Sequence, residues 1–210
     1  MSEAAGAVVH VVEDDELSRT AAARVLRQAG HSVRLYASAD EFLQHLPDGP
    51  GCIVLDLQMP GSSGLDLQER LASVEDAWPI VFVSGHGNVP KTAHAMKSGA
   101  VDFLTKPVDV DALLDAVGRA LARDAAGRRV REQQRDARRR YERLTPRERE
   151  VFAHVISGQL NKQIAFDLGT TEHTVKVHRH RVMEKLEADS TADLIRLASV
   201  LDVAPRGSVR

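Results

Sequence analysis

Acidic residues and one lysine follow three separate apolar runs in the first half of the chain. They are Glu13-Asp14-Asp15 after Val8–Val12, Asp56 after Cys52–Leu55, and Lys106 after Val101–Thr105. Each run is rich in β-branched residues and predicts a buried parallel strand. Because the carboxyl ends of parallel strands converge on one crevice of an open α/β sheet, we expect these charged side chains to meet.

Carboxylates that lie this close repel one another unless a cation lies among them. Oxygen-rich, partly hydrated sites of this kind suit Mg²⁺. A carboxylate held beside Mg²⁺ and a lysine is well placed to accept a phosphoryl group. The residue types and their spacing therefore predict a metal-dependent phosphoryl-accepting site.

Strand and helix patterns alternate through the part of the chain that must position these residues. The predicted strands are 8–12, 33–36, 52–57, 80–83 and 102–104, and the predicted helices are 17–29, 38–46, 65–72, 89–98 and one that starts near residue 110. Gly30 and Gly99 follow two of these helices and indicate helix ends. Five successive strand–helix units predict an α/β fold with a doubly wound, five-stranded parallel sheet.

Charge is distributed unevenly along the 210 residues, although the formal net charge is only −2. Residues 1–118 carry 8 Lys/Arg and 17 Asp/Glu, or −9, whereas residues 119–210 carry 20 and 13, or +7. Such a division fits an acidic metal-binding module joined to a basic nucleic-acid-binding module. An uneven charge distribution also arises by chance in small domains, so the sequence motifs must show whether two such modules are present.

A single cysteine, Cys52, excludes an internal disulfide, and its apolar surroundings predict an inert buried thiol in a reducing compartment. Apolar stretches fall short of the roughly 18 residues that predict a membrane span. The start Met1-Ser2-Glu3-Ala4 lacks the basic residues of a signal peptide. We therefore expect a soluble cytoplasmic protein without membrane association.

The segment 123–143 is a charged connector that is compatible with helix and could extend the helix before it. Between residues 119 and 143 there are 10 Lys/Arg and 4 Asp/Glu, with Gly127 the single glycine and no proline. A coiled-coil arm would need an apolar seam, and the seam here is mostly alanine with Val130. The composition favours a solvated helix or a flexible linker over a coiled coil.

Four short helices are predicted after this connector, at 145–157, 161–168, 173–186 and 191–201. Thr145-Pro146-Arg147-Glu148 is typical of a helix start, with a Thr cap, a proline at the first helical position and a glutamate at the third. On the third helix, Val175, Val182 and Leu186 recur at helical spacing and are expected to face a core. The second half therefore predicts a small all-α domain.

Together these motifs resemble the FixJ/NarL family of two-component response regulators over nearly the whole chain. The front half resembles a receiver domain with a flavodoxin-like fold, and Ser84-Gly85-His86-Gly87-Asn88-Val89-Pro90 is similar to the FixJ subgroup. The second half resembles a LuxR-type helix-turn-helix through Gly158, Asn161, Ile164-Ala165, Leu168-Gly169, Thr174-Val175-Lys176 and His178. The resemblance implies a receiver at 1–122, a helical linker at 123–143, a DNA-binding domain at 144–204 and a disordered tail at 205–210.

The receiver resemblance assigns a role to each matching position. Asp56 is the expected phosphoacceptor, and the expected Mg²⁺ (or Mn²⁺) ligands are Asp14, Asp15, Asp56 and the backbone carbonyl of Gln58. Lys106 and Ser84 are expected to bind the phosphoryl group, and Phe103 is expected to turn inward as the switch residue. The Lys106-Pro107 peptide is often cis in this family.

Four positions refine or depart from the family pattern. Ser84 stands where threonine is common, and both hydroxyls serve. Gln58 and His86, two residues beyond Asp56 and Ser84, are predicted to set the lifetime of the phosphoryl group. Glu187 stands where glycine is frequent, which bears on how the recognition helix ends.

The LuxR-type resemblance assigns DNA contacts to the helix 173–186, whose N-terminal part is expected to enter the major groove. The expected base contacts are Lys176, Val177 and His180. The expected phosphate contacts, which give affinity without sequence information, are Thr174, His178, Arg179, Arg181 and Lys185, joined by Asn161 and Lys162.

The sequence thus favours a transcription regulator and not a conventional enzyme, with at most slow self-dephosphorylation. A sensor histidine kinase is expected to phosphorylate Asp56, and the resulting homodimer is expected to bind promoter DNA and, with RNA polymerase, to activate transcription. An aspartate-nucleophile phosphatase is the alternative enzyme, but it needs a second aspartate where Gln58 stands. A DNA-binding protein with a vestigial receiver is the other alternative, and the complete acidic pocket argues against it.

Overall fold

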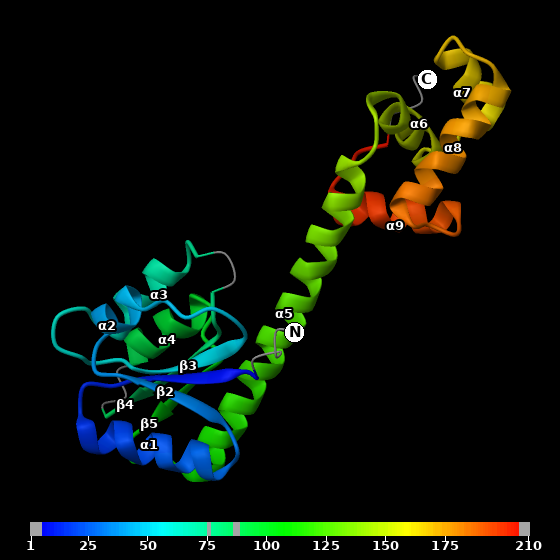
Figure 1. The fold of residues 1–210 in the computed structure, drawn as a ribbon. Helices are drawn as coiled ribbons and strands as arrows, with labels where there is room; N and C mark the ends of the chain where they lie inside the picture. Colours follow the sequence, from blue (N-terminus) through cyan, green and yellow to red (C-terminus); the bar gives the residue numbers. More distant parts are fainter. Residues whose placement is uncertain (1–5, 75–76, 86–88, 206–210) are drawn as a thin grey trace. The chain divides into compact units, whose positions relative to one another are not determined.

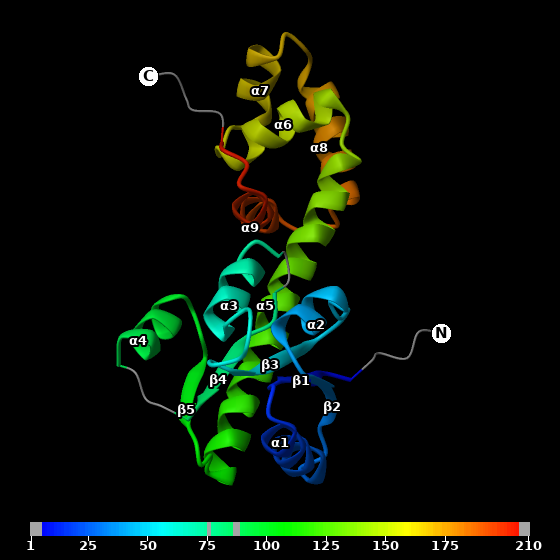
Figure 2. The same ribbon diagram turned by 90° about the vertical axis from the view of Figure 1, so that its left-hand side faces the viewer.

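The structure is a computed structural model that describes residues 6–74, 77–85 and 89–205. The chain divides into two compact units, Met1–Arg128 and Arg129–Arg210, each shown in Figures 1 and 2. In chain order the first unit contains β1 (Val8–Val12), α1 (Glu16–Gln28), β2 (Ser32–Tyr36), α2 (Ala39–Gln44), β3 (Gly51–Asp56), α3 (Gly64–Leu71), β4 (Ile80–Ser84), α4 (Val89–Lys97), β5 (Asp102–Thr105) and the first part of α5 (Val110–Glu142).

The five strands of this unit are all parallel and lie in the order β2-β1-β3-β4-β5. This confirms the predicted doubly wound sheet, and the observed elements differ from the predicted ones by one or two residues at most ends. Since β1 and β3 are neighbours, Val12 and Leu55 are register partners, and the residues that follow each strand emerge at one sheet edge.

Helices cover both faces of the sheet, so each face has its own apolar core. On one face Phe42 of α2, Leu67 of α3 and Ala95 of α4 pack in a cluster with alternate strand residues such as Ile53. On the other face Leu26 of α1 and residues of α5 pack with the remaining strand residues. Figures 1 and 2 show α1 and α5 on the opposite side of the sheet from α2, α3 and α4.

Helix α3 begins close to the carboxyl end of β3, and glycine is required there. A Cβ atom on Gly64 would lie 2.4 Å from the backbone oxygen of Asp56, which no larger residue could tolerate. Ser63 caps the helix, and its hydroxyl and the Asp66 carboxylate form a reciprocal capping box. The loop that follows Asp56 is therefore held tightly against the strand end.

The far end of β3 is attached to α5. The carboxylate of Asp124, only 3% exposed, accepts a hydrogen bond of 2.9 Å from the backbone N–H of Gly51. The guanidinium of Arg128 donates to the same carboxylate at 2.8 and 3.0 Å and balances its charge. The beginning of the predicted linker is therefore packed on the receiver unit, and helix α5 continues without interruption to Glu142.

The second unit contains the end of α5, followed by α6 (Pro146–Ile156), α7 (Asn161–Asp167), α8 (Glu172–Leu186) and α9 (Thr191–Leu201), which confirms the four predicted helices. Thr145 and Glu148 form the predicted capping box with proline in the first turn. Val175, Val182 and Leu186 of α8 are buried in a core with residues from α6, α7 and α9. The fold class is thus as predicted: an α/β unit with a five-stranded parallel sheet and a small all-α unit.

The last turns of α5 belong to this second core. Ala137 is 3% exposed, and the ring of Tyr141 packs 5.7 Å from that of Phe152 of α6. The guanidinium of Arg149 lies 5.2 Å from the centre of the Tyr141 ring. The end of the predicted linker therefore packs on the second unit, and Val130 between the two packed ends is half exposed.

Within residues 6–74, 77–85 and 89–205, no helix is both long and apolar enough to span a membrane.

Cys52 is buried. Burial is the main cause that raises the pKa of its thiol to about 12, and the nearby charge of Asp124 adds to this rise, in keeping with the predicted inert thiol. The predicted tail lies outside the described residues from position 206 onward.

Candidate functional site

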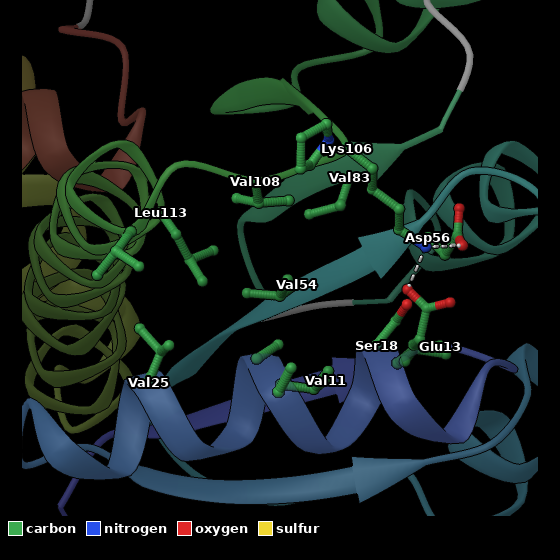
Figure 3. A pocket seen from close by; sticks show the side chains of 15 residues that line it. Val11, Glu13, Ser18, Val25, Val54, Asp56, Val83, Lys106, Val108 and Leu113 are labelled. Atoms are coloured by element: carbon green, nitrogen blue, oxygen red, sulfur yellow. Dashed lines mark hydrogen bonds and ion pairs between the residues drawn. The ribbon is translucent and has the colours of Figure 1, made fainter.

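Lys106 joins the ends of three strands at the carboxyl edge of the sheet. Its ammonium lies 2.7 Å from the carboxylate of Asp56, the last residue of β3, and 2.7 Å from that of Glu13, the residue after β1. Figure 3 shows the ammonium between the two carboxylates, with both ion pairs drawn. Both carboxylates are almost fully buried, whereas Lys106 is about a quarter exposed. The predicted meeting of residues from distant parts of the chain is therefore observed.

Three carboxylates gather at this edge: those of Glu13, Asp14 and Asp56 each place an oxygen within 4.8 Å of the others. Arg19 shapes the loop that carries two of them, because its guanidinium donates to the backbone oxygens of Glu13 at 2.6 Å and of Asp14 at 3.1 Å. Oxygen donors at this spacing, with Asp14 exposed to water, fit a hydrated divalent cation.

The electrostatics of this group reflect burial first and the neighbouring charges second. Burial raises the pKa of Glu13 to about 7, and the neighbouring Asp56 adds to this rise while Lys106 opposes it. Burial lowers the pKa of Lys106, but its hydrogen bonds to Asp56 and Glu13 outweigh that effect and raise the pKa overall. Lys106 thus remains charged at neutral pH, and a cation beside Glu13 would favour its ionised form.

The structure gives Asp15 a different role from the expected metal ligation. Its carboxylate accepts a 2.8 Å hydrogen bond from the backbone N–H of Ser18 and caps the N-terminus of α1. The hydrogen bonds from Ser18 hold the pKa of Asp15 below its ordinary value. The carboxylates that gather with Asp56 are those of Glu13 and Asp14, whereas the carboxylate of Asp15 caps the first turn of α1.

The remaining receiver residues surround Asp56. The backbone N–H of Gln58 donates to Asp56 at 2.9 Å, while the Gln58 side chain is exposed. Ser84 is fully buried at the end of β4, and its backbone oxygen accepts from the N–H of Lys106 at 2.8 Å. The half-buried ring of Phe103 packs on that of Phe82 at a centroid distance of 6.2 Å.

The Lys106-Pro107 peptide is cis, as the resemblance implied. His86, which the sequence paired with Gln58 as a determinant of phosphoryl lifetime, lies outside the described residues.

The second unit presents a basic helix surface. On α8 the side chains of Lys176, Val177, His180 and Arg181 are exposed, as the expected contacts with DNA require. Val177 is 38% exposed although it is apolar. Lys162, in the first turn of α7, is exposed as well. These positions can reach a nucleic acid without disturbing the core.

Other expected phosphate contacts have partners inside the domain. The guanidinium of Arg179 donates to Asn161 Oδ1 at 3.2 Å and to Thr191 Oγ1 at 2.7 Å, and so joins α8 to α7 and α9. Lys185 donates to the buried Glu148 at 2.7 Å and to the backbone oxygen of Arg143 at 3.2 Å. The ammonium of Lys185 therefore already has a buried carboxylate as its partner, and its expected phosphate contact stays a prediction.

Two further residues of this group are half buried. Thr174 exchanges a 2.9 Å hydroxyl hydrogen bond with Thr171, the N-cap of α8. His178 has a buried Nδ1 atom without a hydrogen-bond partner among the described residues. Both lie on α8 near the exposed basic positions.

Comparison with known proteins decides the family. The family model "Response regulator receiver domain" matches residues 9–118, and "Bacterial regulatory proteins, luxR family" matches residues 142–198. The chain is 40% identical to the transcriptional regulatory protein FixJ of Azorhizobium caulinodans over 94% of both chains. The chain belongs to the FixJ/NarL family of response regulators. It therefore combines a receiver with a LuxR-type DNA-binding domain, as predicted.

Other relatives of this response regulator agree. Nodulation protein W of Bradyrhizobium diazoefficiens is 45% identical over 94% of this chain and 88% of its own length. Among solved structures, the response regulator StyR is 45% identical and matches 91% of this chain and 98% of its own with a TM-score of 0.84. Full-length FixJ from B. japonicum is 36% identical, with coverages of 94% and 98% and a TM-score of 0.57.

Sequence reasoning expected Glu13 to meet the other charged side chains, but the family resemblance gave the metal-ligand role to Asp14 and Asp15 and not to Glu13. The available signal was position: Glu13 directly follows β1, whereas Asp15 stands three residues before Ser18 at the start of a helix. An aspartate at that spacing is typical of an N-cap, and the strand end is where ligands gather.

Proposed function

We propose that Asp56 is the phosphoacceptor of this response regulator and that a sensor histidine kinase supplies the phosphoryl group. The observation that carries the proposal is the contact of Asp56 with Lys106, 2.7 Å away at the sheet edge beside Glu13 and Asp14. A carboxylate oxygen of Asp56 attacks the phosphorus, the phosphorus–nitrogen bond of the kinase phosphohistidine breaks, and an acyl phosphate forms on Asp56.

The surrounding residues fit a divalent cation, Mg²⁺ or Mn²⁺, held by Glu13, Asp14, Asp56 and the backbone carbonyl of Gln58. When bound, such a cation supplies positive charge that offsets the incoming phosphoryl oxygens. The ammonium of Lys106 already lies beside the reacting carboxylate, so it can reach an oxygen of the phosphoryl group. It then exchanges one of its two carboxylate partners for that oxygen.

Ser84 and Phe103 then carry the change to the surface of the receiver. The Ser84 hydroxyl hydrogen-bonds the phosphoryl group at the end of β4, and Phe103 turns inward toward the space that opens. A high-energy acyl phosphate at Asp56 can bias such a two-state element. The chain acts in this scheme as a phosphoacceptor with slow self-dephosphorylation and not as a conventional enzyme.

The experiment that tests the phosphoacceptor uses the full chain with Mg²⁺ and acetyl phosphate as donor, and intact mass reports the added phosphoryl group. The wild type is expected to gain one group and Asp56→Asn none. Asp48→Asn is the matched control, since Asp48 is an exposed aspartate outside the acidic group. Equal labelling of wild type and Asp56→Asn would overturn the assignment.

We further propose that the phosphorylated cytoplasmic protein forms a homodimer that binds promoter DNA and, with RNA polymerase, activates transcription. The exposed Lys176, Val177 and His180 of α8 support base contacts, and Arg181 and Lys162 support phosphate contacts. Paired half-sites follow from a dimer of such domains.

Light scattering with and without Mg²⁺ and beryllofluoride, a phosphoryl mimic, tests the dimer on the wild type and on Asp56→Ala. A mass that doubles in the wild type alone supports the proposal. An unchanged mass together with DNA binding that still depends on the mimic would replace dimerisation by release of the DNA-binding domain.

A further inference from the structure

A cavity of about 370 Å³ lies between α1 and the start of α5, on the face of the sheet that these helices cover. Its walls are largely hydrocarbon and come from both helices and from the strands beneath them. Six of the residues that form them are Ala21, Ala22, Val25, Val54, Val83 and Leu113. Figure 3 shows Val25 of α1 and Leu113 of α5 on one side of this space, with Val54 of the sheet beneath.

The sequence of α1 explains why this space is not filled. The side of the helix that lines the cavity carries Ser18, Ala21, Ala22 and Val25, and two of these four side chains are single methyl groups. The sheet beneath them contributes valines, which are also short. Leu26 of α1 and Leu113 of α5 are buried against the sheet, and the short side chains beside them leave space between the two helices unfilled.

The charged residues at one end of the cavity satisfy one another. Glu13, Asp56 and Lys106 contribute to the lining, and the lysine is paired with both carboxylates at 2.7 Å. In the proposed function this end takes Mg²⁺ and the phosphoryl group, so a charged ligand that filled the cavity would compete with both for the same side chains. An uncharged molecule in the hydrocarbon part of the cavity takes no partner away from these groups.

The volume sets the size of the occupant. Pockets that hold small molecules are usually about 300–1,000 Å³ and mainly apolar, so this cavity lies at the lower end of that range. An apolar cavity of roughly 150 Å³ is already enough for a benzene ring. The space therefore suits a molecule of about two rings, or a branched hydrocarbon of similar bulk.

We propose that this cavity, here called the α1–α5 cavity, is a binding site for an uncharged, hydrocarbon-rich small molecule. The site is distinct in chemistry from the phosphoryl-accepting group and goes beyond the proposed function. Because Asp56 and Lys106 line both, a ligand whose affinity depends on the phosphorylation state would in turn alter phosphorylation, since coupling between sites is reciprocal.

The test measures binding of N-phenyl-1-naphthylamine, an uncharged dye with a naphthalene and a phenyl group that fluoresces in apolar surroundings, to the full chain without a phosphoryl donor. Its matched probe is 1-anilinonaphthalene-8-sulfonate, which has the same rings and a negative charge. We expect saturable binding of the uncharged dye to one site and at least tenfold weaker binding of the sulfonate at that site. Equal affinities, or no saturable binding of the uncharged dye, would overturn the proposal.

Filling the cavity locates the site. Ala22→Leu is expected to weaken binding of the uncharged dye at least tenfold, whereas Thr20→Leu, which adds the same side chain to the exposed side of α1, leaves it unchanged. If Ala22→Leu does not fold, Ala21→Leu serves as a second filling variant. Ala21 also lines the cavity, and because it is exposed it tolerates a larger side chain. Wild-type affinity in a folded filling variant would show that the dye binds elsewhere and would refute the site.

Discussion

Lys185 of α8 donates a 2.7 Å hydrogen bond to Glu148 of α6, a carboxylate that is 3% exposed, and this pair fixes the recognition helix to the first helix of its domain. Glu148 also accepts from the backbone N–H of Thr145 at 2.8 Å. Burial tends to raise the pKa of Glu148, but Lys185 and Thr145 outweigh it and lower that pKa. The lysine therefore acts first as the counter-charge of a buried carboxylate.

Lys185→Met is predicted to destabilise the DNA-binding domain by about 2 kcal/mol, because it leaves a buried charge without its partner. Because Lys185 is 32% exposed, the expected loss is below the roughly 3–5 kcal/mol of a fully buried pair. Thermal unfolding followed by far-UV circular dichroism measures it, with fluorescence of the single tryptophan, Trp78, marking the receiver separately. Glu148→Gln in the same chain should recover part of the loss.

The DNA affinity of this variant separates a structural role from a phosphate contact. Loss of a phosphate contact reduces the slope of log affinity against log salt by about one, as expected for Lys162→Met on the exposed surface of α7. Lys185→Met should leave that slope unchanged at temperatures where the domain is folded. A reduced slope for Lys185→Met would show that Lys185 contacts a phosphate.

Glu187→Gly is predicted to stabilise the DNA-binding domain by about 1 kcal/mol, because Glu187 ends α8 with φ of 52°, in the left-handed region that disfavours side chains. The substitution loses a surface ion pair of Glu187 with Arg140 at 3.0 Å, which is worth about 0.5 kcal/mol or less. Glu187→Ala loses the same ion pair and keeps the strain, so it should be slightly less stable than the wild type. Equal melting temperatures for the two variants would contradict the role of strain.

Glu13→Gln is predicted to weaken Mg²⁺ binding by about tenfold or more, because it removes one of three converging carboxylates. Asp15→Asn is the matched control: it removes a charge two residues away, from a side chain that caps α1. Its metal affinity should change little, since asparagine is also a good N-cap. Titration calorimetry of both variants decides, and a larger loss for Asp15→Asn would return Asp15 to the metal site.

The receiver is predicted to lose stability as the pH falls from about 6.5 to about 4, because of His10. Burial, followed by the charge of Arg34, lowers the pKa of this residue from 6.5 to about 4. The unfolded chain therefore binds a proton that the folded receiver rejects within that window, so acid favours unfolding by up to about 3 kcal/mol, while above pH 6.5 the effect vanishes.

Urea unfolding followed by Trp78 fluorescence at several pH values measures this dependence. His10→Gln, which does not titrate, should show a flatter profile between pH 6.5 and 4 than the wild type. The rings of Tyr36, Phe42 and Trp78 lie within about 6 Å of the His10 ring and account for its burial. Parallel profiles for the two proteins would show that His10 is not the group responsible.

The sequence by itself determined the fold class, the order of the elements and the position of most site residues. Continuous apolar, β-branched runs define strands locally, and Gly, Pro and capping residues define helix ends, so Asp56 and Lys106 could be assigned to strand ends. The helix start at Thr145 follows from neighbouring residues alone. These signals lie within a few residues of the feature that they predict.

Only the tertiary structure decided which of two nearby acidic residues joins the group around Asp56. It also decided which basic side chain of the DNA-binding domain has a carboxylate partner inside the domain. Glu13 and Asp15 are two positions apart, and the direction in which α1 leaves β1 turns the first toward Lys106 and makes the second a cap. Lys185 and Glu148 are 37 residues apart, and packing of α8 on α6 brings them together. The α1–α5 cavity likewise depends on the distance between two helices, which side-chain volumes across the sheet determine and which no local pattern encodes.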